Sequence, residues 1–169
     1  MKFLEKDLEQ IIHEASVEEL GELGLFLGTK TKRQVRIGKY GIADIVGMHV
    51  DLYDASDPKA SREVTFTVCE LKQNNVSISA FLQALRYAKG INRYIKTNKK
   101  RLEYKHKIRI VLIGKSLPVD CDLIYLTDFL SWGGLWDSKF SLEIFTYDYS
   151  INGIKFKRHE NYKLRHEGF

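Results

Sequence analysis

A helix-like segment between two β-like runs is the feature that most constrains the fold of this chain. The run 64–72 alternates toward an apolar face, the segment 80–96 repeats apolar residues at helical spacing, and the run 107–114 is again β-like. A strand–helix–strand succession makes a right-handed crossover, which places both strands parallel in one sheet. The sequence therefore predicts an α/β fold built around this unit.

Two helices are expected before this unit. Segment 3–15 repeats apolar residues at helical spacing. Ser16 followed by Glu19 has the pattern of a capping box, in which each side chain bonds the other residue's backbone N–H. A second, short helix should therefore begin after Ser16.

The helix expected over 80–96 has a candidate cap in Ser77 or Ser79, since a hydroxyl there can accept from the first free amides. At a period of 3.6 residues, its predicted buried face consists of Phe81, Leu85, Ala88, Ile91 and Ile95. A stripe beside that face carries Gln83, Tyr87, Gly90 and Tyr94.

Two further β-like runs, 34–37 and 40–52, come before the run 64–72 and predict an antiparallel meander. Near the end of the chain, the runs 142–149 and 154–158 are separated by a stretch that contains Asn-Gly. Because this dipeptide suits a tight turn, a C-terminal β-hairpin is expected. The segment 123–132 fits a helix or a strand.

The length of 169 residues suits one domain, with a real hydrophobic core. We predict a single domain over 1–169, with a motif-bearing core over about 1–115 and a β-rich extension over about 116–169. Neither linker composition nor an internal repeat divides the chain.

The net charge of +5 favours polyanionic partners, because lysine and arginine displace counterions from a phosphate backbone. The two cysteines, Cys69 and Cys121, have no C-x-x-C spacing that would indicate a zinc or redox site. Charges interrupt the apolar residues of 1–7, and no apolar run approaches membrane-spanning length. We therefore expect a cytoplasmic protein without membrane partners.

Two charged residues end the β-like run 64–72. Side chains alternate along a strand, so Glu70 and Lys72 share the face of the apolar residues before them. Their Cα atoms should be about 6–7 Å apart, so both side chains can reach one ion or one scissile phosphate. A metal-assisted hydrolase needs this arrangement. A simple ion pair at a strand end is the ordinary alternative.

Asp44 shares its face of the run 40–52 with Ile42 and Val46. Desolvating an unpaired carboxylate costs on the order of several kcal/mol, so a cation or ammonium is expected beside it. Two carboxylates on adjacent strands make a hard oxygen site suited to Mg²⁺. An aspartate alone is also typical of a turn or an edge strand, and a tyrosine such as Tyr87 is more often a core residue.

Taken together, these residues resemble the PD-(D/E)XK nuclease superfamily. The likeness is greatest to the nuclease domain of NucS-like endonucleases and to restriction-endonuclease-like proteins, and it covers 4–94. Its motif residues, in order, are Asp44, Glu70-Leu71-Lys72, Gln83 and Tyr87. Glu-x-Lys alone is weakly specific, whereas the ordered set is moderately specific. Ala43 stands where the superfamily's proline would be, a common departure.

NucS-like proteins also carry a metal-holding glutamate on the first helix, within a pattern like E-x-x-L-x-x-x-I. Residues 5–12 fit this pattern. On a helical wheel Glu5 lies nearer to the apolar face than Glu9 does, so Glu5 is the preferred residue and Glu9 the alternative.

The resemblance implies a restriction-endonuclease-like core, with a mixed central β-sheet flanked by helices. It also implies hydrolysis of DNA phosphodiester bonds with one or two Mg²⁺ ions, for which Mn²⁺ can substitute, held by Asp44, Glu70 and Glu5. Lys72 would orient or deprotonate the attacking water, or neutralise charge in the transition state. Gln83 and Tyr87 would be positioning donors.

The expected activity is that of an endodeoxyribonuclease in repair, restriction or mobile-element biology. Basic residues that can contact DNA are Arg33, Arg36, Lys39, Arg86, Lys99, Lys100 and Arg101. A solvated surface is the alternative for all of them. A short chain with no separate recognition domain predicts either a homodimer or a partner protein that supplies targeting.

Two other functions compete with the nuclease. The chain could be a DNA-binding module that keeps the fold without cutting, or a protein-interaction module with aromatic anchors such as Trp132 and Trp136. Only the nuclease requires cleavage that stops with EDTA and with Lys72→Ala.

Overall fold

The computed structural model describes residues 4–52, 62–98, 105–118, 122–131, 140–151 and 153–159, and only the backbone of 128–131. Its helices and strands follow one another as α1 (Glu5–Glu14), α2 (Val17–Glu22), β1 (Lys30–Arg36), the 3₁₀ turn η1 (Gly38–Tyr40), β2 (Ile42–Leu52), β3 (Arg62–Leu71), α3 (Ile78–Thr97), β4 (Lys105–Gly114), α4 (Leu123–Ser131), β5 (Phe140–Ser150) and β6 (Gly153–His159). Residues 123–131 of the ambiguous segment are therefore helical.

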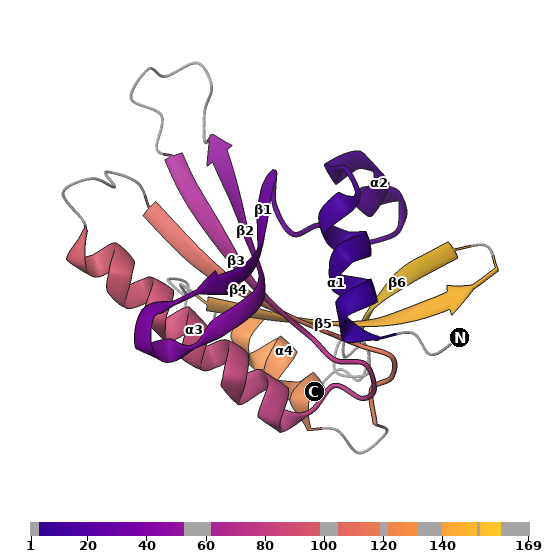
Figure 1. Ribbon diagram of the computed structural model, residues 1–169. Coiled ribbons are helices and arrows are strands. Elements are labelled where there is room, and N and C mark those ends of the chain that lie inside the picture. Colours follow the sequence, from indigo (N-terminus) through magenta and orange to yellow (C-terminus); the bar gives the residue numbers. More distant parts are fainter. Residues whose placement is uncertain are drawn as a thin grey trace, which may run out of the picture.

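A six-stranded mixed sheet runs through the molecule in the order β1-β2-β3-β4-β5-β6 (Figure 1). Strands β1, β2 and β3 pair antiparallel, which confirms the predicted meander. Strand β4 is parallel to β3, as the crossover predicts, and also parallel to β5. Strands β5 and β6 pair antiparallel, with Ser150 opposite Gly153, while Asn152 of the expected turn lies outside the described residues.

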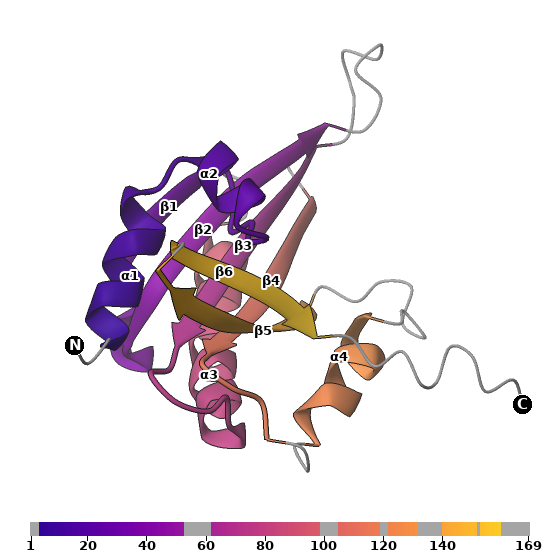
Figure 2. The same cartoon turned by 90° about the vertical axis from the view of Figure 1, so that its right-hand side faces the viewer.

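Helices cover both faces of the sheet (Figures 1 and 2). One core cluster joins Leu8 and Ile12 of α1 to strand residues such as Val111. The other joins Ala84 and Ala88 of α3 to the opposite side of the same strands. Strand β4 is buried on both faces, as is usual for a parallel strand between helix layers. None of the helices in the described part of the chain combines the length and apolar composition of a membrane span.

Side-chain caps begin two of the helices, as predicted. Ser16 Oγ accepts from the Glu19 N–H at 3.1 Å, and the Ser16 N–H donates to the Glu19 carboxylate at 2.7 Å, which closes the capping box. Ser77 Oγ accepts from the Ala80 N–H at 3.2 Å, so Ser77 caps α3 and Ser79 lies inside the helix.

The predicted buried face of α3 is partly wrong. Leu85 is 39% exposed, whereas the predicted polar-stripe residues Tyr87 and Gly90 are buried. Helix α3 is rotated about its own axis relative to the predicted orientation, because its small residues face inward. A Cβ at Gly90 would lie 2.5 Å from Ile37 and 2.7 Å from the Tyr40 ring, so a larger residue there would push η1 away.

Candidate active site at the ends of strands β2 and β3

The predicted acidic pair lies on neighbouring strands. The antiparallel register pairs Ile45 of β2 with Cys69 of β3, so one step further along both strands come Asp44 and Glu70. The negative charge of Asp44 contributes to raising the pKa of Glu70, which means that the two carboxylates are close enough to interact. The register thus places the two residues opposite each other, and a shared metal site stays a prediction.

Glu70 is almost completely buried, with 1% of its surface exposed. Its Oε1 accepts a hydrogen bond from Lys72 Nζ at 2.7 Å. Its Oε2 is also buried, and no donor among the described residues reaches it. Burial is the main cause that raises the pKa of Glu70 to about 7; Lys72 opposes the rise, and the charge of Asp44 adds to it.

Asp44 is half-buried, and its side chain crosses to the neighbouring strand. Its Oδ2 accepts from the Leu71 N–H at 2.8 Å. Burial raises the pKa of Asp44 and outweighs the lowering by this hydrogen bond and by the charge of Lys72. Both carboxylates are thus held where a negative charge is unfavourable without a cation.

Lys72 follows the last residue of β3 and supplies the positive charge nearest to Glu70. Burial lowers the pKa of Lys72, but the hydrogen bond to Glu70 and the surrounding carboxylates outweigh burial and raise that pKa. Lys72 is therefore an ammonium at neutral pH, and it can neutralise an anion more readily than it can accept a proton.

The helical wheel predicted that Glu5 points inward more easily than Glu9, and this prediction is wrong. Glu9 is buried at 6% exposure, and Glu5 is exposed. Glu9 points inward because β1 neutralises it: Arg33 Nε donates at 2.7 Å and Gln34 Nε2 donates at 2.7 Å. Glu5 instead accepts from the Gln73 N–H at 2.9 Å, just beyond Lys72, and its charge acts on both site carboxylates.

Gln83 and Tyr87 contact each other through a hydrogen bond from Gln83 Nε2 to Tyr87 Oη at 2.9 Å. Tyr87 is buried, and its ring packs against Gly41, where an added Cβ would lie 2.8 Å from the ring. Gly41 also has φ +115°, a conformation that favours glycine. Tyr87 therefore supports the start of the strand that carries Asp44, and its expected role as a donor stays a prediction.

Two features near the site have no local signal in the sequence. Gln34 has φ +48°, uncommon for a residue other than glycine, between the register pairs Arg33–Ile45 and Val35–Ala43. Tyr147 of β5 donates from its hydroxyl to the Gln73 carbonyl at 3.0 Å, across 74 residues of sequence. The Tyr147 contact depends on strand order, which only the sheet establishes.

The donor set suits a hard divalent cation. Asp44 and Glu70 offer carboxylate oxygens in a negative, largely buried setting, and Glu70 Oε2 is left without a donor among the described residues. Mg²⁺ usually takes one or two carboxylates and keeps several waters. Within the described ranges, no group of three or more His, Cys, Asp or Glu side chains is arranged to hold a metal ion.

The expected DNA-contact residues have different surroundings. Arg33 is committed to the buried Glu9, whereas Arg36, Lys39 and Arg86 are exposed. The Arg86 guanidinium lies over the Tyr87 ring, 5.6 Å from its centre. Lys99, Lys100 and Arg101 lie outside the described residues, as do Trp132 and Trp136.

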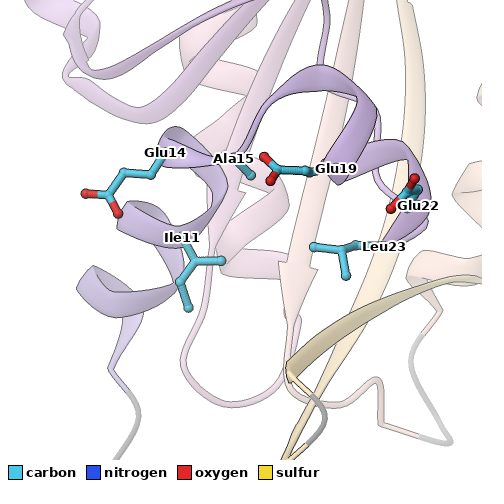
Figure 3. Close-up of a pocket in the computed structure, with 6 residues that line it drawn as sticks. All are labelled: Ile11, Glu14, Ala15, Glu19, Glu22 and Leu23. Carbon is cyan, nitrogen blue, oxygen red and sulfur yellow. The ribbon is translucent and has the colours of Figure 1, made fainter.

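An open pocket between α1 and α2 is separate from this site (Figure 3). Its lining residues are Ile11, Glu14, Ala15, Glu19, Glu22 and Leu23. Glu19 is engaged in the cap of α2, and Glu14 accepts from Gln10 Nε2 at 2.8 Å. The acidic rim would repel a polyanion, so this pocket does not suit a nucleic acid.

The chain matches no family model, no curated protein and no solved structure.

Proposed function

We propose that this chain is a Mg²⁺-dependent endodeoxyribonuclease of the PD-(D/E)XK class. The proposal includes a restriction-endonuclease-like core with a C-terminal β-hairpin, and a role in repair, restriction or mobile-element biology. The observation that carries it is Glu70: a buried carboxylate, interacting with Asp44, has one oxygen on Lys72 and one oxygen without a donor in the described structure. A buried charge of this kind calls for a cation.

Asp44 and Glu70 would hold Mg²⁺, with Glu5 as the third acidic residue of the site. The bound ion would polarise the scissile phosphate and lower the pKa of a water bound to it. Lys72 would neutralise charge that develops on the phosphate, because its raised pKa keeps it protonated at neutral pH. Gln83 and Tyr87 would orient the substrate from α3.

A DNA-binding module that does not cut is the second candidate function. The 2.7 Å bond from Lys72 to Glu70 supports it, because an internal ammonium already neutralises one carboxylate without any metal. The two functions differ in cleavage alone, so cleavage is the measurement that separates them.

The test is incubation of supercoiled plasmid, linear, branched and single-stranded DNA with Mg²⁺ or Mn²⁺. Asp44→Asn and Lys72→Ala should each lower the rate of DNA cleavage by roughly 100-fold or more. EDTA should stop cleavage. Asp51→Asn, on the same strand but paired with His49, is the matched control and should cleave like the wild type. Equal product from Asp44→Asn and wild type would overturn the proposal, and salt-dependent binding without cleavage would favour the module.

A further inference from the structure

Helix α3 carries four basic residues and no carboxylate between Ile78 and Thr97. The four, Arg86, Lys89, Arg93 and Lys96, follow one another at spacings of three or four residues, and all are exposed. Residues at these spacings lie on one face of a helix. Like charges in such a row repel one another, so the row suits a surface that binds an anion.

The turn η1 adds one basic residue, Lys39, to this row. It packs on α3 at Gly90, where a Cβ would lie within 2.7 Å of both Ile37 and Tyr40 side chains. Lys39 of η1 is exposed, with Nζ 5.9 Å from the centre of the Tyr40 ring. Because α3 has glycine at this point, η1 comes close enough to place its lysine beside the helix.

Tyr40 marks the point where these cations converge. Arg93 lies close enough to the Tyr40 hydroxyl to be the main cause that lowers the pKa of Tyr40, and the charges of Lys39 and Lys89 act in the same direction. Burial of the hydroxyl opposes this lowering. A negative charge on this oxygen would be stabilised by three cations from two elements, as the charge of a phosphate oxygen would be.

The helix layer on the other face of the sheet, formed by α1 and α2, is negatively charged. Helix α1 carries four carboxylates and α2 carries three, against the single lysine Lys6. The two layers lie on different faces of the sheet (Figures 1 and 2). A polyanion would be repelled from the α1–α2 side and attracted to the α3 side, because the field of the whole molecule steers it.

The row begins beside the candidate active site. Arg86 Nη2 lies 3.5 Å from the position of a Cβ on Gly41, three residues before Asp44. From Arg86 to Lys96 the helix rises about 15 Å at 1.5 Å per residue. One DNA strand carries a phosphate about every 3.4 Å along the duplex axis, so this length matches about four phosphates.

We propose that Lys39, Arg86, Lys89, Arg93 and Lys96, here called the α3–η1 basic face, bind the phosphate backbone of duplex DNA and lead it to the candidate active site. The choice of DNA as the polyanion rests on the proposed nuclease function. The binding surface itself stands on the geometry and charge of α3 and η1.

The test measures binding without cleavage, by fluorescence anisotropy of a labelled mixed-sequence duplex in EDTA. Lys89→Glu/Lys96→Glu should raise Kd roughly 10-fold or more and lessen the salt dependence of log Kd by about two phosphate contacts. The matched control is Lys155→Glu/Lys157→Glu on β6, at the opposite edge of the sheet, which changes the net charge equally. It should change Kd by less than about 3-fold.

Equal losses for both double variants would overturn the proposal, because net charge alone would then explain binding. Stronger binding to vesicles rich in phosphatidylserine than to the duplex would also overturn it. Arg93→Gln and Arg86→Gln give a second, milder series, and thermal unfolding checks that each variant is folded. Failure of the nuclease proposal would look different: no cleavage with any cation, while duplex binding still depends on the α3–η1 basic face.

Discussion

Opposing effects act on the charge of the Glu70 carboxyl. Its burial disfavours the charged form, Lys72 favours that form, and Asp44 opposes it again. The outcome is a carboxyl with a pKa of about 7, against an ordinary value of 4.5. A group that titrates near neutrality links the stability of the chain to pH.

Glu70→Gln should remove a pH-dependent loss of stability. Between pH 4.5 and about 7 the native state binds more protons than the unfolded state, so the free energy of unfolding falls as pH rises through this window. Above this window, in the absence of metal, Glu70→Gln should be more stable than the wild type by about 3 kcal/mol. Urea unfolding at pH 4 and pH 8 in EDTA measures this, with the exposed Glu22→Gln as control. A constant difference at both pH values would contradict the expected titration.

Mg²⁺ should offset the loss of stability that the buried charge of Glu70 causes. If Asp44 and Glu70 hold the ion, millimolar Mg²⁺ should raise the urea midpoint of the wild type at pH 8, because a ligand that binds only the native state stabilises it. Glu70→Gln and Asp44→Asn should show a much smaller rise, and Asp51→Asn a rise like that of the wild type. The same Mg²⁺ response in Glu70→Gln would place the ion elsewhere.

At the scale of elements, α1 is attached to the sheet by a buried charge. Glu9 of α1 is bonded by Arg33 and Gln34 of β1, while Glu5 at the start of the same helix accepts from Gln73 after β3. The helix therefore bridges the edge strand and the end of β3. This places its first turn beside the candidate active site.

Arg33→Ala should destabilise the chain by about 2 kcal/mol or more, because it leaves the carboxylate of Glu9 buried without its cation. Lys32→Ala, at the neighbouring exposed position of β1, should change stability by less than about 0.5 kcal/mol. Chemical unfolding at pH 7 compares them. Recovery of stability in the double variant Arg33→Ala/Glu9→Gln would identify the unpaired charge as the cause, and no recovery would point to packing instead.

For the whole molecule, the central strand joins the two core clusters. Leu112 belongs to the cluster under α3 and Ile113 to the cluster under α1, and both are 0% exposed. Neighbouring residues of β4 thus hold both helix layers to one sheet. We therefore expect the two layers to unfold together.

Leu112→Ala and Ile113→Ala should each lower stability by about 2–5 kcal/mol, and each should shift a single transition. Far-ultraviolet and near-ultraviolet circular dichroism during thermal unfolding should give coincident curves. Ile151→Ala, at a fully exposed position, should leave the curve unchanged. Two separate transitions in either core variant would show that the helix layers unfold independently.

The sequence by itself determined those features that depend on short stretches of chain. The capping box of Ser16 and Glu19 and the cap at Ser77 were predictable because their hydrogen bonds join residues three apart. The meander and the parallel β3–β4 pair followed from strand periodicity and from the crossover rule. Asp44, Glu70 and Lys72 stood out because charges at the ends of apolar strand faces are unusual.

Only the tertiary structure decided which charges are neutralised and by what. Glu9 is buried because Arg33 approaches from a strand 24 residues away, and Leu85 is exposed because Gly90 lets α3 turn its small residues toward η1. Tyr147 reaches the Gln73 backbone only because β5 lies beside β4. Periodicity in the sequence indicates which side of a helix or strand is apolar. The partner that neutralises a buried charge comes from a distant part of the sequence, so it is set by long-range packing.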